Sequence, residues 1–403
     1  MSKIIILFFF IFYNLLNANI LQDAIDNAKE GSILKVPKGI YKGSIKINKP
    51  ISIIGKEEGV IIDGLGEGTV IEINSPYVTI KNLTIIGSGE RHDKLDAAIK
   101  ISNSKQSEIS DNIIKDCLFG IDVSMTNNSI ISNNYITSKD LDLGLRGDGL
   151  RLWYSNDNIV SKNKLINSRD MVVWYSHGNE ISENYGENNR YSLHFMYAGK
   201  NYVKNNTYKF NSVGIFFMYS KDTLASGNII KSSLGATGMG IGLKDVSNFT
   251  LKDNTVIYCA QGIYIDHSPF EPDTKNWIEN NKILYNAEAL HFHSLSENNV
   301  IKGNNILGNI EDVINDSRGS KTDKNEIVNN YWDNYEGFDK NGDNIGDTPH
   351  KVFQYADQLW VYNPNVKFFY GSPVISLLNF LAKLAPFSQP VFLMSDKEPK
   401  LKI

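Results

Sequence analysis

Apolar and polar positions along this chain repeat as a unit of about 22 residues. In each unit an asparagine precedes a short apolar pair such as Ile113–Ile114, and a second apolar run, usually opened by glycine, follows some nine residues later. Short β-branched and aromatic runs separated by Asn, Gly, Ser and Asp indicate short strands joined by turns. The asparagines that mark the repeat are Asn112, Asn134, Asn163, Asn184, Asn206, Asn228, Asn254, Asn281, Asn305 and Asn330.

One unit of this size cannot bury its apolar side alone, whereas stacked units bury a continuous core. The pattern therefore predicts an all-β protein, a single-stranded right-handed parallel β-helix (solenoid) of roughly ten coils about 4.8 Å apart. Asparagine suits the turns because it tolerates left-handed backbone geometry, and its amide can bond to the same amide one coil away. We therefore expect a ladder of structural asparagines.

Both ends of a solenoid expose strand edges, and the sequence predicts a helix near each end. Leu21, Ala24, Ile25 and Ala28 have helical spacing and predict a short N-terminal capping helix. Ser372 and Pro373 begin a second, hydrophobic helix that Pro386 ends, and it is too short to span a bilayer. This helix either caps the solenoid or docks on a membrane partner, and its candidate contact residues are Leu377, Leu378, Phe380, Leu381 and Leu384.

The N-terminal residues have the pattern of a Sec-type signal peptide. Lys3 provides the positive region, Ile4 to Leu16 the apolar region, and Ala18 a small residue for cleavage. We expect residues 1–18 to be removed and the protein to be exported, with an uncleaved anchor as the alternative. The expected organisation is then a β-helix over 19–335, an Asp/Gly-rich loop region over 336–370, and a C-terminal helix and tail over 371–403.

The net charge argues against a nucleic-acid partner, and the cysteine positions argue against a disulfide. The formal net charge of −4 gives no basic surface, so no nucleic-acid partner is expected. Cys117 and Cys259 each lie five residues after a repeat asparagine, which places them in one column of the solenoid but six coils, about 29 Å, apart. A disulfide needs Cα atoms within about 7 Å, so two buried thiols are expected.

Alternation along the glycine-opened strands separates residues that face the core from residues that face outward. Around residue 173 we expect Val172 and Trp174 to face inward. Aromatic, Met and His side chains on the outward wall are unusual, because a solvated β surface normally carries Thr, Lys, Glu and Ser. The expected outward pairs are Arg151/Trp153, Val173/Tyr175, His194/Met196, Phe216/Met218, Gly242/Lys244, Tyr264/Asp266 and His291/His293.

His194, Met196 and Met218 are the main candidate metal ligands. Met196 and Met218 share a column on adjacent coils, with His194 on the same face, and thioether and imidazole groups suit copper. Further candidate copper ligands are Met171 and His267 at the edges of this wall, and His291 and His293 about 19 Å away, which would need a second site. Two alternatives stay open for this wall. One is an apolar patch for docking a partner, and the other is a carbohydrate platform of Trp153, Tyr175, Tyr197 and Tyr219.

Two further groups of charged residues resemble, in composition, a catalytic site and a calcium loop. The charged residues near Asp148 lie on different loops and form no tight acidic pair on the wall, so no enzymatic activity is expected. Asp339, Asn341, Asp343 and Asp347 are spaced like the first half of a calcium loop but lack its closing Glu, so calcium and a metal-free turn are both open.

Three sequence runs carry a resemblance to a known family. They are Gly147–Tyr154, Tyr191–Tyr197 with Gly214–Tyr219, and Asn330–Tyr335 leading into the Asp339–Asp347 loop. Together with the export signal and hydrophobic tail they resemble the NosD family of periplasmic β-helix proteins, although His350 stands where that family usually has Tyr. The resemblance implies a non-enzymatic role in assembling the copper–sulfur cluster of nitrous oxide reductase.

The resemblance also implies partners, which are the membrane subunit and ATPase of an ABC transporter and a copper chaperone lipoprotein. On this hypothesis His194, Met196 and Met218 receive copper and pass it to the apo-reductase, while the C-terminal helix attaches the solenoid to the transporter at the inner membrane. The rival hypothesis is a carbohydrate-binding or carbohydrate-processing β-helix.

Overall fold

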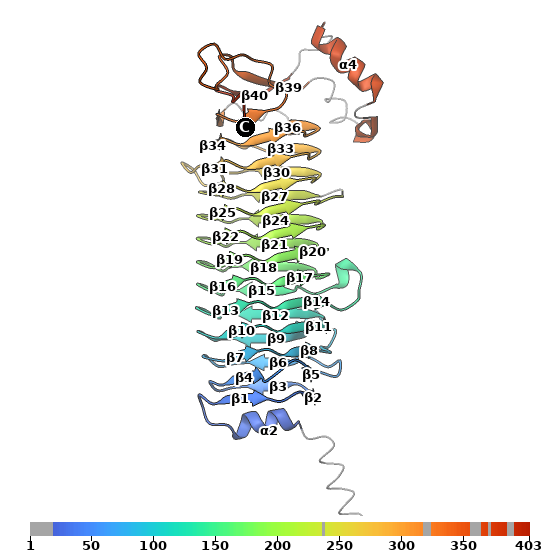
Figure 1. Ribbon diagram of the computed structural model, residues 1–403, viewed down its shortest axis with the longest axis vertical. Coiled ribbons are helices and arrows are strands. Elements are labelled where there is room, and N and C mark those ends of the chain that lie inside the picture. The colour runs from blue at the N-terminus through green and yellow to red at the C-terminus, as the bar shows by residue number, and fades with distance from the viewer. Residues whose placement is uncertain (1–18, 236–237, 317–323, 355–363, 370–371, 385–390) are drawn as a thin grey trace, which may run out of the picture. The chain divides into compact units, whose positions relative to one another are not determined.

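The computed structural model describes residues 19–235, 238–316, 324–354, 364–369, 372–384 and 391–403 (Figure 1). The expected signal peptide lies outside these residues. The described chain is a parallel β-helix of about 13 turns, each of which contributes short strands to three parallel sheets. It divides into two compact units at Arg190 and Tyr191, and we describe each unit by itself.

The first unit, up to Arg190, contains the N-terminal helix α2 (Ile20–Asn27), the 3-10 turn η1 (Leu143–Leu145) and parallel strands that pair with the strand three places along the chain. In its first sheet lie β1 (Ile33–Val36), β4 (Ser52–Gly55), β7 (Thr79–Lys81), β10 (Glu108–Ser110), β13 (Ile130–Ser132), β16 (Ile159–Ser161) and β19 (Glu180–Ser182). In its second lie β2 (Gly39–Lys42), β5 (Val60–Asp63), β8 (Thr84–Ile86), β11 (Ile113–Cys117), β14 (Tyr135–Ser138), β17 (Lys164–Ile166) and β20 (Tyr185–Glu187). In its third lie β3 (Ile45–Ile47), β6 (Ile71–Ile73), β9 (Ala97–Ser102), β12 (Phe119–Ser124), β15 (Leu150–Trp153) and β18 (Asp170–Trp174).

The second unit, from Tyr191, repeats this arrangement. Its first sheet contains β22 (Tyr202–Lys204), β25 (Leu224–Ser226), β28 (Thr250–Lys252), β31 (Asn276–Glu279), β34 (Asn299–Lys302) and β37 (Glu326–Val328). Its second contains β23 (Thr207–Lys209), β26 (Ile229–Lys231), β29 (Thr255–Ile257), β32 (Lys282–Leu284), β35 (Asn305–Leu307) and β38 (Tyr331–Trp332). Its third contains β21 (Tyr191–Met196), β24 (Val213–Met218), β27 (Met239–Lys244), β30 (Gln261–Asp266), β33 (Glu288–His293) and β36 (Glu311–Asn315).

The core is built from columns of like residues at equivalent positions of successive coils. In the first sheet of the first unit, Ile53, Ile80, Ile109 and Ile131 are register partners in turn, and all are buried. Each buried side chain of this size stabilises the fold by about 1.5–3 kcal/mol relative to exposure. The prediction of a parallel β-helix is therefore confirmed, while the expected ten coils were too few because the first coils lack the marker asparagine.

The predicted N-terminal cap is present as helix α2. Leu21 and Ile25 face the solenoid and are buried, and the Asn19 side chain accepts a hydrogen bond from the Gln22 backbone N–H at 3.1 Å. The Gln22 side chain also bonds both backbone groups of Lys46 in the edge strand β3, at 2.7 and 3.1 Å. The helix thus covers an edge that would otherwise template aggregation.

The asparagine ladder is present, with two corrections. Along it, each side-chain amide donates to the side-chain oxygen of the next asparagine, as from Asn228 to Asn254 at 2.9 Å. The ladder passes from Asn281 through Asn304 to Asn330, so Asn304 and not Asn305 is its member in that coil. The left-handed conformation belongs to the residue before each ladder asparagine, for example Asn133 at φ 56° and Asp253 at φ 56°. Burial inside the turn, and not a left-handed backbone, therefore selects asparagine.

The C-terminal segments of the second unit are a strand pair and two helices. Strand β39 (His350–Gln354) pairs antiparallel with β40 (Val391–Asp396), and the 3-10 turn η3 (Pro364–Phe369) precedes helix α4 (Pro373–Leu384). Helix α4 occupies the predicted range, and the Ser372 hydroxyl accepts a hydrogen bond from the Ile375 N–H at 3.4 Å. The strand β40 was not predicted.

Both cysteines are free and buried, as expected. Burial raises the pKa of the Cys117 thiol to about 12 and that of Cys259 to about 11, because the thiolate loses hydration. Both side chains are therefore inert core thiols.

A buried carboxyl group in β36 makes stability depend on pH. Burial first, and the charge of Asp333 second, raise the pKa of Asp312 from 3.8 to about 7. Because the unfolded chain ionises at lower pH, folding loses stability as the pH rises from about 4 to about 7, at about 1.4 kcal/mol per pKa unit. We expect Asp312→Asn to be more stable than the wild type at pH 8 and close to it at pH 4, measured by urea unfolding. An equal difference at both pH values, or a similar effect of the exposed control Asp253→Asn, would contradict this assignment.

Candidate functional site

The third sheet of the second unit presents two columns of functional side chains on its outward face. In one column Met196, Met218, Lys244, Asp266 and His293 are successive register partners. In the other, His194, Phe216, Gly242, Tyr264 and His291 follow one another in the same way. The residue pairs that the sequence predicted for these strands fall in these two columns, which place a donor group at each end.

His194, Met196 and Met218 come together at the β21–β24 end of these columns. The His194 imidazole Nε2 lies 3.3 Å from the Met218 sulfur, and Met196 is the register partner of Met218. His194 is 7% exposed, whereas both methionines are partly exposed. The structure therefore brings the main predicted copper ligands onto one partly open patch of neighbouring coils.

Aromatic rings fix the His194 imidazole in place. Tyr191 stacks on it with ring centroids 4.8 Å apart, and the Phe216 ring lies 6.4 Å from it. Gly242 makes room for Phe216, because a Cβ at that glycine would lie 2.0 Å from the Phe216 ring. The imidazole is thus held by packing with its Nε2 directed at the Met218 sulfur.

An ion pair follows the methionines in the same column. The Lys244 ammonium pairs with the Asp266 carboxylate one coil further on, and this hydrogen bond raises the pKa of Lys244. The lysine charge is thereby neutralised next to Met218. The pair also separates the histidine–methionine patch from the donor groups at the other end of the columns.

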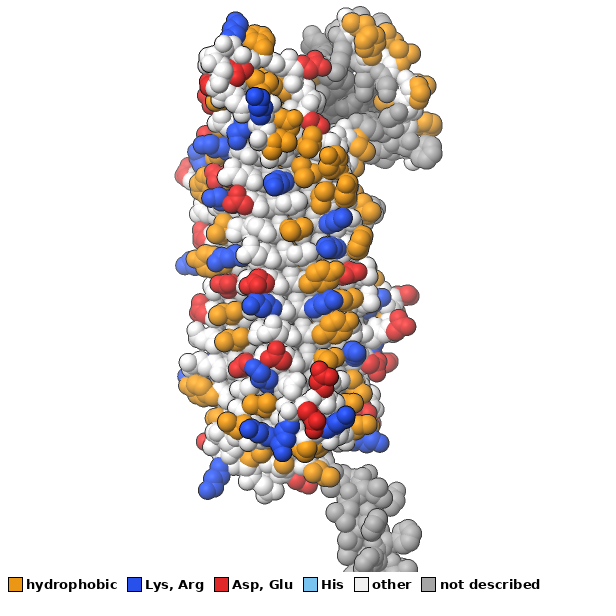
Figure 2. Space-filling view, in the orientation of Figure 1, with side chains coloured by type: hydrophobic (Ala, Val, Ile, Leu, Met, Phe, Trp, Pro, Cys, Tyr) orange, Lys and Arg blue, Asp and Glu red, His pale blue; other side chains and the backbone are white. Residues whose placement is uncertain are grey.

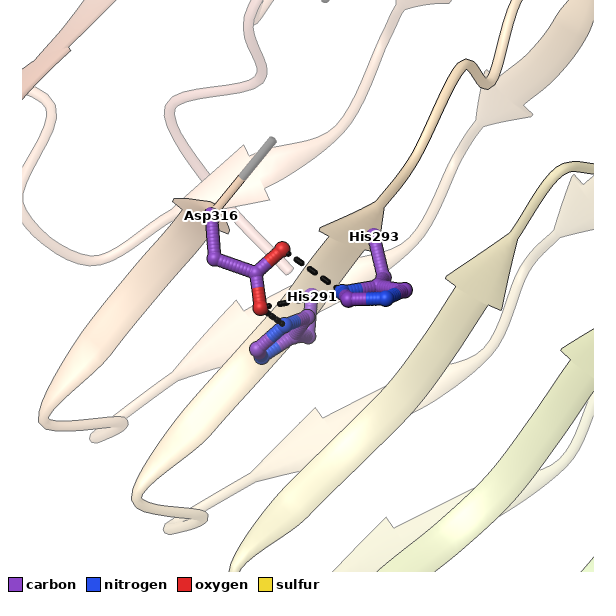
Figure 3. A group of neighbouring side chains, drawn as sticks. All are labelled: His291, His293 and Asp316. Atoms are coloured by element: carbon purple, nitrogen blue, oxygen red, sulfur yellow. Dashed lines mark hydrogen bonds and ion pairs between the residues drawn. The ribbon is translucent and has the colours of Figure 1, made fainter. Parts of the chain in front are cut away.

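His291, His293 and Asp316 form a second group of donors (Figure 3). His291 Nε2 lies 3.2 Å from one Asp316 carboxylate oxygen, and His293 Nδ1 lies 2.8 Å from the other. Among the residues that the structure describes, this is the one group of three or more His, Cys, Asp and Glu whose ligand atoms all lie within 4.8 Å of one another. Strand alternation predicted both histidines but not Asp316, which follows β36 and has no motif to mark it.

Glu288 holds His291 from behind, and the amide group of Gln261 lies beside the same ring nitrogen. The His291 Nδ1 lies 2.6 Å from a carboxylate oxygen of the buried Glu288 and 3.1 Å from the amide nitrogen of Gln261. The shorter contact indicates that Nδ1 carries a proton and donates a hydrogen bond to Glu288. Burial lowers the pKa of His291, but the bonds to Asp316 and Glu288 outweigh it and raise the pKa to about 9. Burial raises the pKa of Asp316, but the hydrogen bonds and charges of His291 and His293 outweigh it. The pKa of Asp316 is therefore lowered.

Met171 and Val173 do not lie where the sequence predicted. Met171 is the register partner of the buried Leu150 and is 1% exposed, and Val173 is the partner of the buried Leu152. Both therefore face the core, and Trp174 faces outward beside Trp153, with ring centroids 5.8 Å apart. The strand begins with Asp170 in place of glycine, which shifted the expected alternation by one residue. Met171 is consequently removed from the candidate copper ligands.

Paired charges lie on successive coils of the first unit. Arg151, Arg169 and Arg190 bind the buried carboxylates Asp122, Asp148 and Asp170, respectively, with nitrogen–oxygen distances of 2.9–3.0 Å. Burial, opposed by Arg169, raises the pKa of Asp148 to about 6. Each carboxylate thus has an arginine on the following coil, which accounts for these charges as ion pairs.

Three of the four aromatic residues proposed as a carbohydrate platform lie in stacked pairs of tyrosine rings. Tyr197 stacks on Tyr219 at 4.8 Å in the second unit, and Tyr154 stacks on Tyr175 at 4.9 Å in the first. Part of each ring face is therefore covered by its neighbour, although Tyr197 remains 44% exposed.

His267 and the Asp/Gly-rich loop contribute no ligands to these two groups. His267 Nδ1 lies 2.8 Å from Asp245, on the coil before it. In the loop, Asp339 accepts hydrogen bonds from the N–H groups of Gly342 and Asn344, at 2.6 and 2.8 Å. These bonds, that from Asn344 first, lower the pKa of Asp339. Calcium binding by this loop stays a prediction.

The fold and these donor groups define a class: a parallel β-helix protein with candidate metal ligands on one sheet. Residues 126–337 match the model of the family described as "Periplasmic copper-binding protein (NosD)". The chain belongs to this family. It is 27% identical to the "Probable ABC transporter binding protein NosD" of Stutzerimonas stutzeri over 92% of this chain and 86% of that protein. The protein of the same description from Pseudomonas aeruginosa is 28% identical over 90% of this chain and 88% of that protein.

Solved structures share the fold at low sequence identity. The mannuronan C-5 epimerase AlgE6 A-module of Azotobacter vinelandii superimposes with a TM-score of 0.57 at 12% identity, over 76% of this chain and 93% of that one. The catalytic unit of a GH87 α-1,3-glucanase from Streptomyces thermodiastaticus gives a TM-score of 0.59 at 14% identity, over 78% of this chain and 65% of that one. At such identities the likeness concerns the fold alone.

Proposed function

We propose that this chain is a non-catalytic, periplasmic copper-binding accessory protein that delivers copper to apo nitrous oxide reductase. Copper is the cargo, and His194, Met196 and Met218 are its binding residues. The observation that carries the proposal is the 3.3 Å separation between His194 Nε2 and the Met218 sulfur. The family description and the names of the two relatives support the copper and transporter parts of the proposal.

The donor spacing suits a metal ion. Metal–nitrogen and metal–sulfur bonds of about 2.1 and about 2.3 Å at a tetrahedral angle place the two donors about 3.6 Å apart. The separation of His194 Nε2 and Met218 Sδ needs only a small side-chain adjustment to reach this value. Neutral thioether and imidazole donors favour copper among the first-row metals, and so few ligands allow the ion to be passed on.

Helix α4 supplies the proposed contact with the membrane subunit of an ABC transporter. Its apolar side chains are exposed, including Leu377 at 56%, Phe380 at 57% and Leu384 at 67%, with Leu378 and Leu381 beside them. Orange side chains gather on this segment in Figure 2. In the described part of the chain, no helix has the length and apolar character needed to cross a membrane. The exposed apolar side chains of α4 are the surface that we propose to dock on this partner.

Anaerobic titration with Cu(I) against a competing chelator tests the copper site. We expect one Cu(I) per chain, with at least 10-fold weaker binding in Met196→Leu/Met218→Leu and in His194→Gln, because each change removes a soft donor. Met125→Leu is the matched control. Met125 is an exposed methionine of the first unit and does not belong to the proposed site.

Unchanged Cu(I) affinity in the double methionine variant would overturn the proposed site. Absence of copper binding, together with binding of oligosaccharides that quenches tryptophan fluorescence, would instead favour the carbohydrate-binding alternative. Trp153, which is partly exposed, is the residue whose replacement would then abolish that quenching.

A further inference from the structure

We propose that His291, His293 and Asp316 form a second metal site, selective for a divalent first-row transition ion, which Glu288 positions. The two sites share no residue, so this inference does not depend on the proposed copper site. Four strand spacings separate His293 from Met196 along one column, about 19 Å at the usual distance between strands. One ion cannot bridge the two groups.

Donor chemistry distinguishes the second site from the first. Two imidazole nitrogens and a carboxylate are borderline and hard donors, and the same set holds catalytic zinc and non-haem iron in other proteins. Metal–ligand bonds of about 2.1 Å at a tetrahedral angle place neighbouring donors about 3.4 Å apart. The observed separations from Asp316 to His291 and His293, 3.2 and 2.8 Å, are close to this spacing.

The elements that carry these donors hold them near this geometry. His291 and His293 are two residues apart in β33, so strand alternation directs both to the outward face. Asp316 follows the adjacent strand β36 and reaches back between them (Figure 3). The Tyr264 ring lies 5.2 Å from the His291 ring and 5.8 Å from the His293 ring, and so supports both imidazoles from the preceding coil.

Glu288 completes the arrangement as a positioning residue. Histidines that bind metals commonly donate their second ring N–H to a carboxylate, which fixes the tautomer and increases ligand basicity. The 2.6 Å contact between His291 Nδ1 and buried Glu288 is of this kind, and it leaves Nε2 for the ion. A plain surface ion pair between a histidine and an aspartate would not need a second, buried carboxylate behind the ring.

Two of the three proposed ligands are partly exposed to solvent, so an ion can reach the site. His291 is buried, whereas the side chains of His293 and Asp316 are 46% and 36% exposed. An ion therefore reaches the site from the His293 side and meets the fixed His291 imidazole at its inner end.

Metal titration of the chelator-treated protein with ZnCl2 and CuCl2 tests the site. We expect one tightly bound divalent ion per chain, and nitrogen hyperfine structure from two imidazoles in the Cu(II) electron paramagnetic resonance spectrum. His293→Gln should weaken Zn²⁺ binding at least 100-fold and Asp316→Asn at least 10-fold. Both replaced side chains are partly exposed, so these variants are expected to fold, as circular dichroism will verify.

Three control variants make the outcome decisive. Glu288→Gln should weaken Zn²⁺ binding about 10–100-fold and alter the Cu(II) spectrum while both nitrogen ligands remain. His177→Gln replaces an exposed histidine of the first unit and should change nothing. Met196→Leu/Met218→Leu should leave Zn²⁺ binding intact, which separates this proposal from the Cu(I) proposal. No retained ion in the wild type, or equal retention by His293→Gln, would overturn the second site.

Discussion

Replacing Asn254 by leucine should abolish or severely reduce stable folding of the second unit. Its side-chain oxygen accepts hydrogen bonds from the Asn228 backbone N–H at 3.0 Å and the Asn228 amide at 2.9 Å. Its own amide donates to the Ala225 carbonyl at 3.0 Å and to Asn281 at 2.9 Å. Leucine has a similar volume but removes the side-chain partner of the two Asn228 donors and of the Ala225 carbonyl, at about 1–3 kcal/mol each. The sum, on the order of 5 kcal/mol, is comparable to the whole stability of many proteins.

Urea unfolding followed by circular dichroism measures this loss, provided that the slope of the transition is unchanged. Lys252→Ala, on the same coil but exposed, is the control and should remain within about 0.5 kcal/mol of the wild type. A loss in Asn254→Leu no larger than in this control would show that the ladder does not stabilise the solenoid.

The repeat made the fold predictable because one physical requirement recurs in every coil. A buried turn needs a side chain that both donates and accepts, and asparagine meets this need at Asn134, Asn163 and Asn228 alike. Where two asparagines are adjacent, the pattern does not reveal which one is buried, so Asn305 was chosen in place of Asn304. The first coils carry no such marker and were not counted, although the same apolar column passes through them as Leu34, Ile53 and Ile80.

Strand alternation predicted most of the candidate site, and its errors have local causes. It placed His194 beside Met218 and His291 beside His293, because a regular parallel register preserves the side-chain period of two. It failed at Met171, where the strand begins one residue earlier than the glycine-opened pattern indicates. Asp316 could not be found in this way, because it belongs to the residues that follow a strand and joins the histidines only through the stacking of two coils.

Asp396 shows how a residue from outside the repeat can end it, and its replacement should have the second largest effect on stability. One of its oxygens accepts hydrogen bonds from the Asn330 backbone at 3.0 Å, the Asn330 amide at 2.9 Å and the indole N–H of Trp332 at 3.0 Å. The carboxylate thus takes the place of the next ladder asparagine, and strand β40 covers the final coil in the way that α2 covers the first. Sequence alone did not reveal this, because a single Asp in a tail has no periodic neighbours.

The two possible replacements of Asp396 separate this ladder role from mere burial. Asp396→Leu leaves three buried donors unpaired, and since hydrogen bonds to a charged group contribute about 1.5–3 kcal/mol each, we expect a loss of several kcal/mol. Asp396→Asn keeps an oxygen toward Asn330 and Trp332, as asparagine does in every earlier coil of the ladder, and should lose less than half as much. Urea unfolding monitored by circular dichroism compares the two variants directly. Equal losses would mean that the negative charge, and not the ladder acceptor, secures the end of the solenoid.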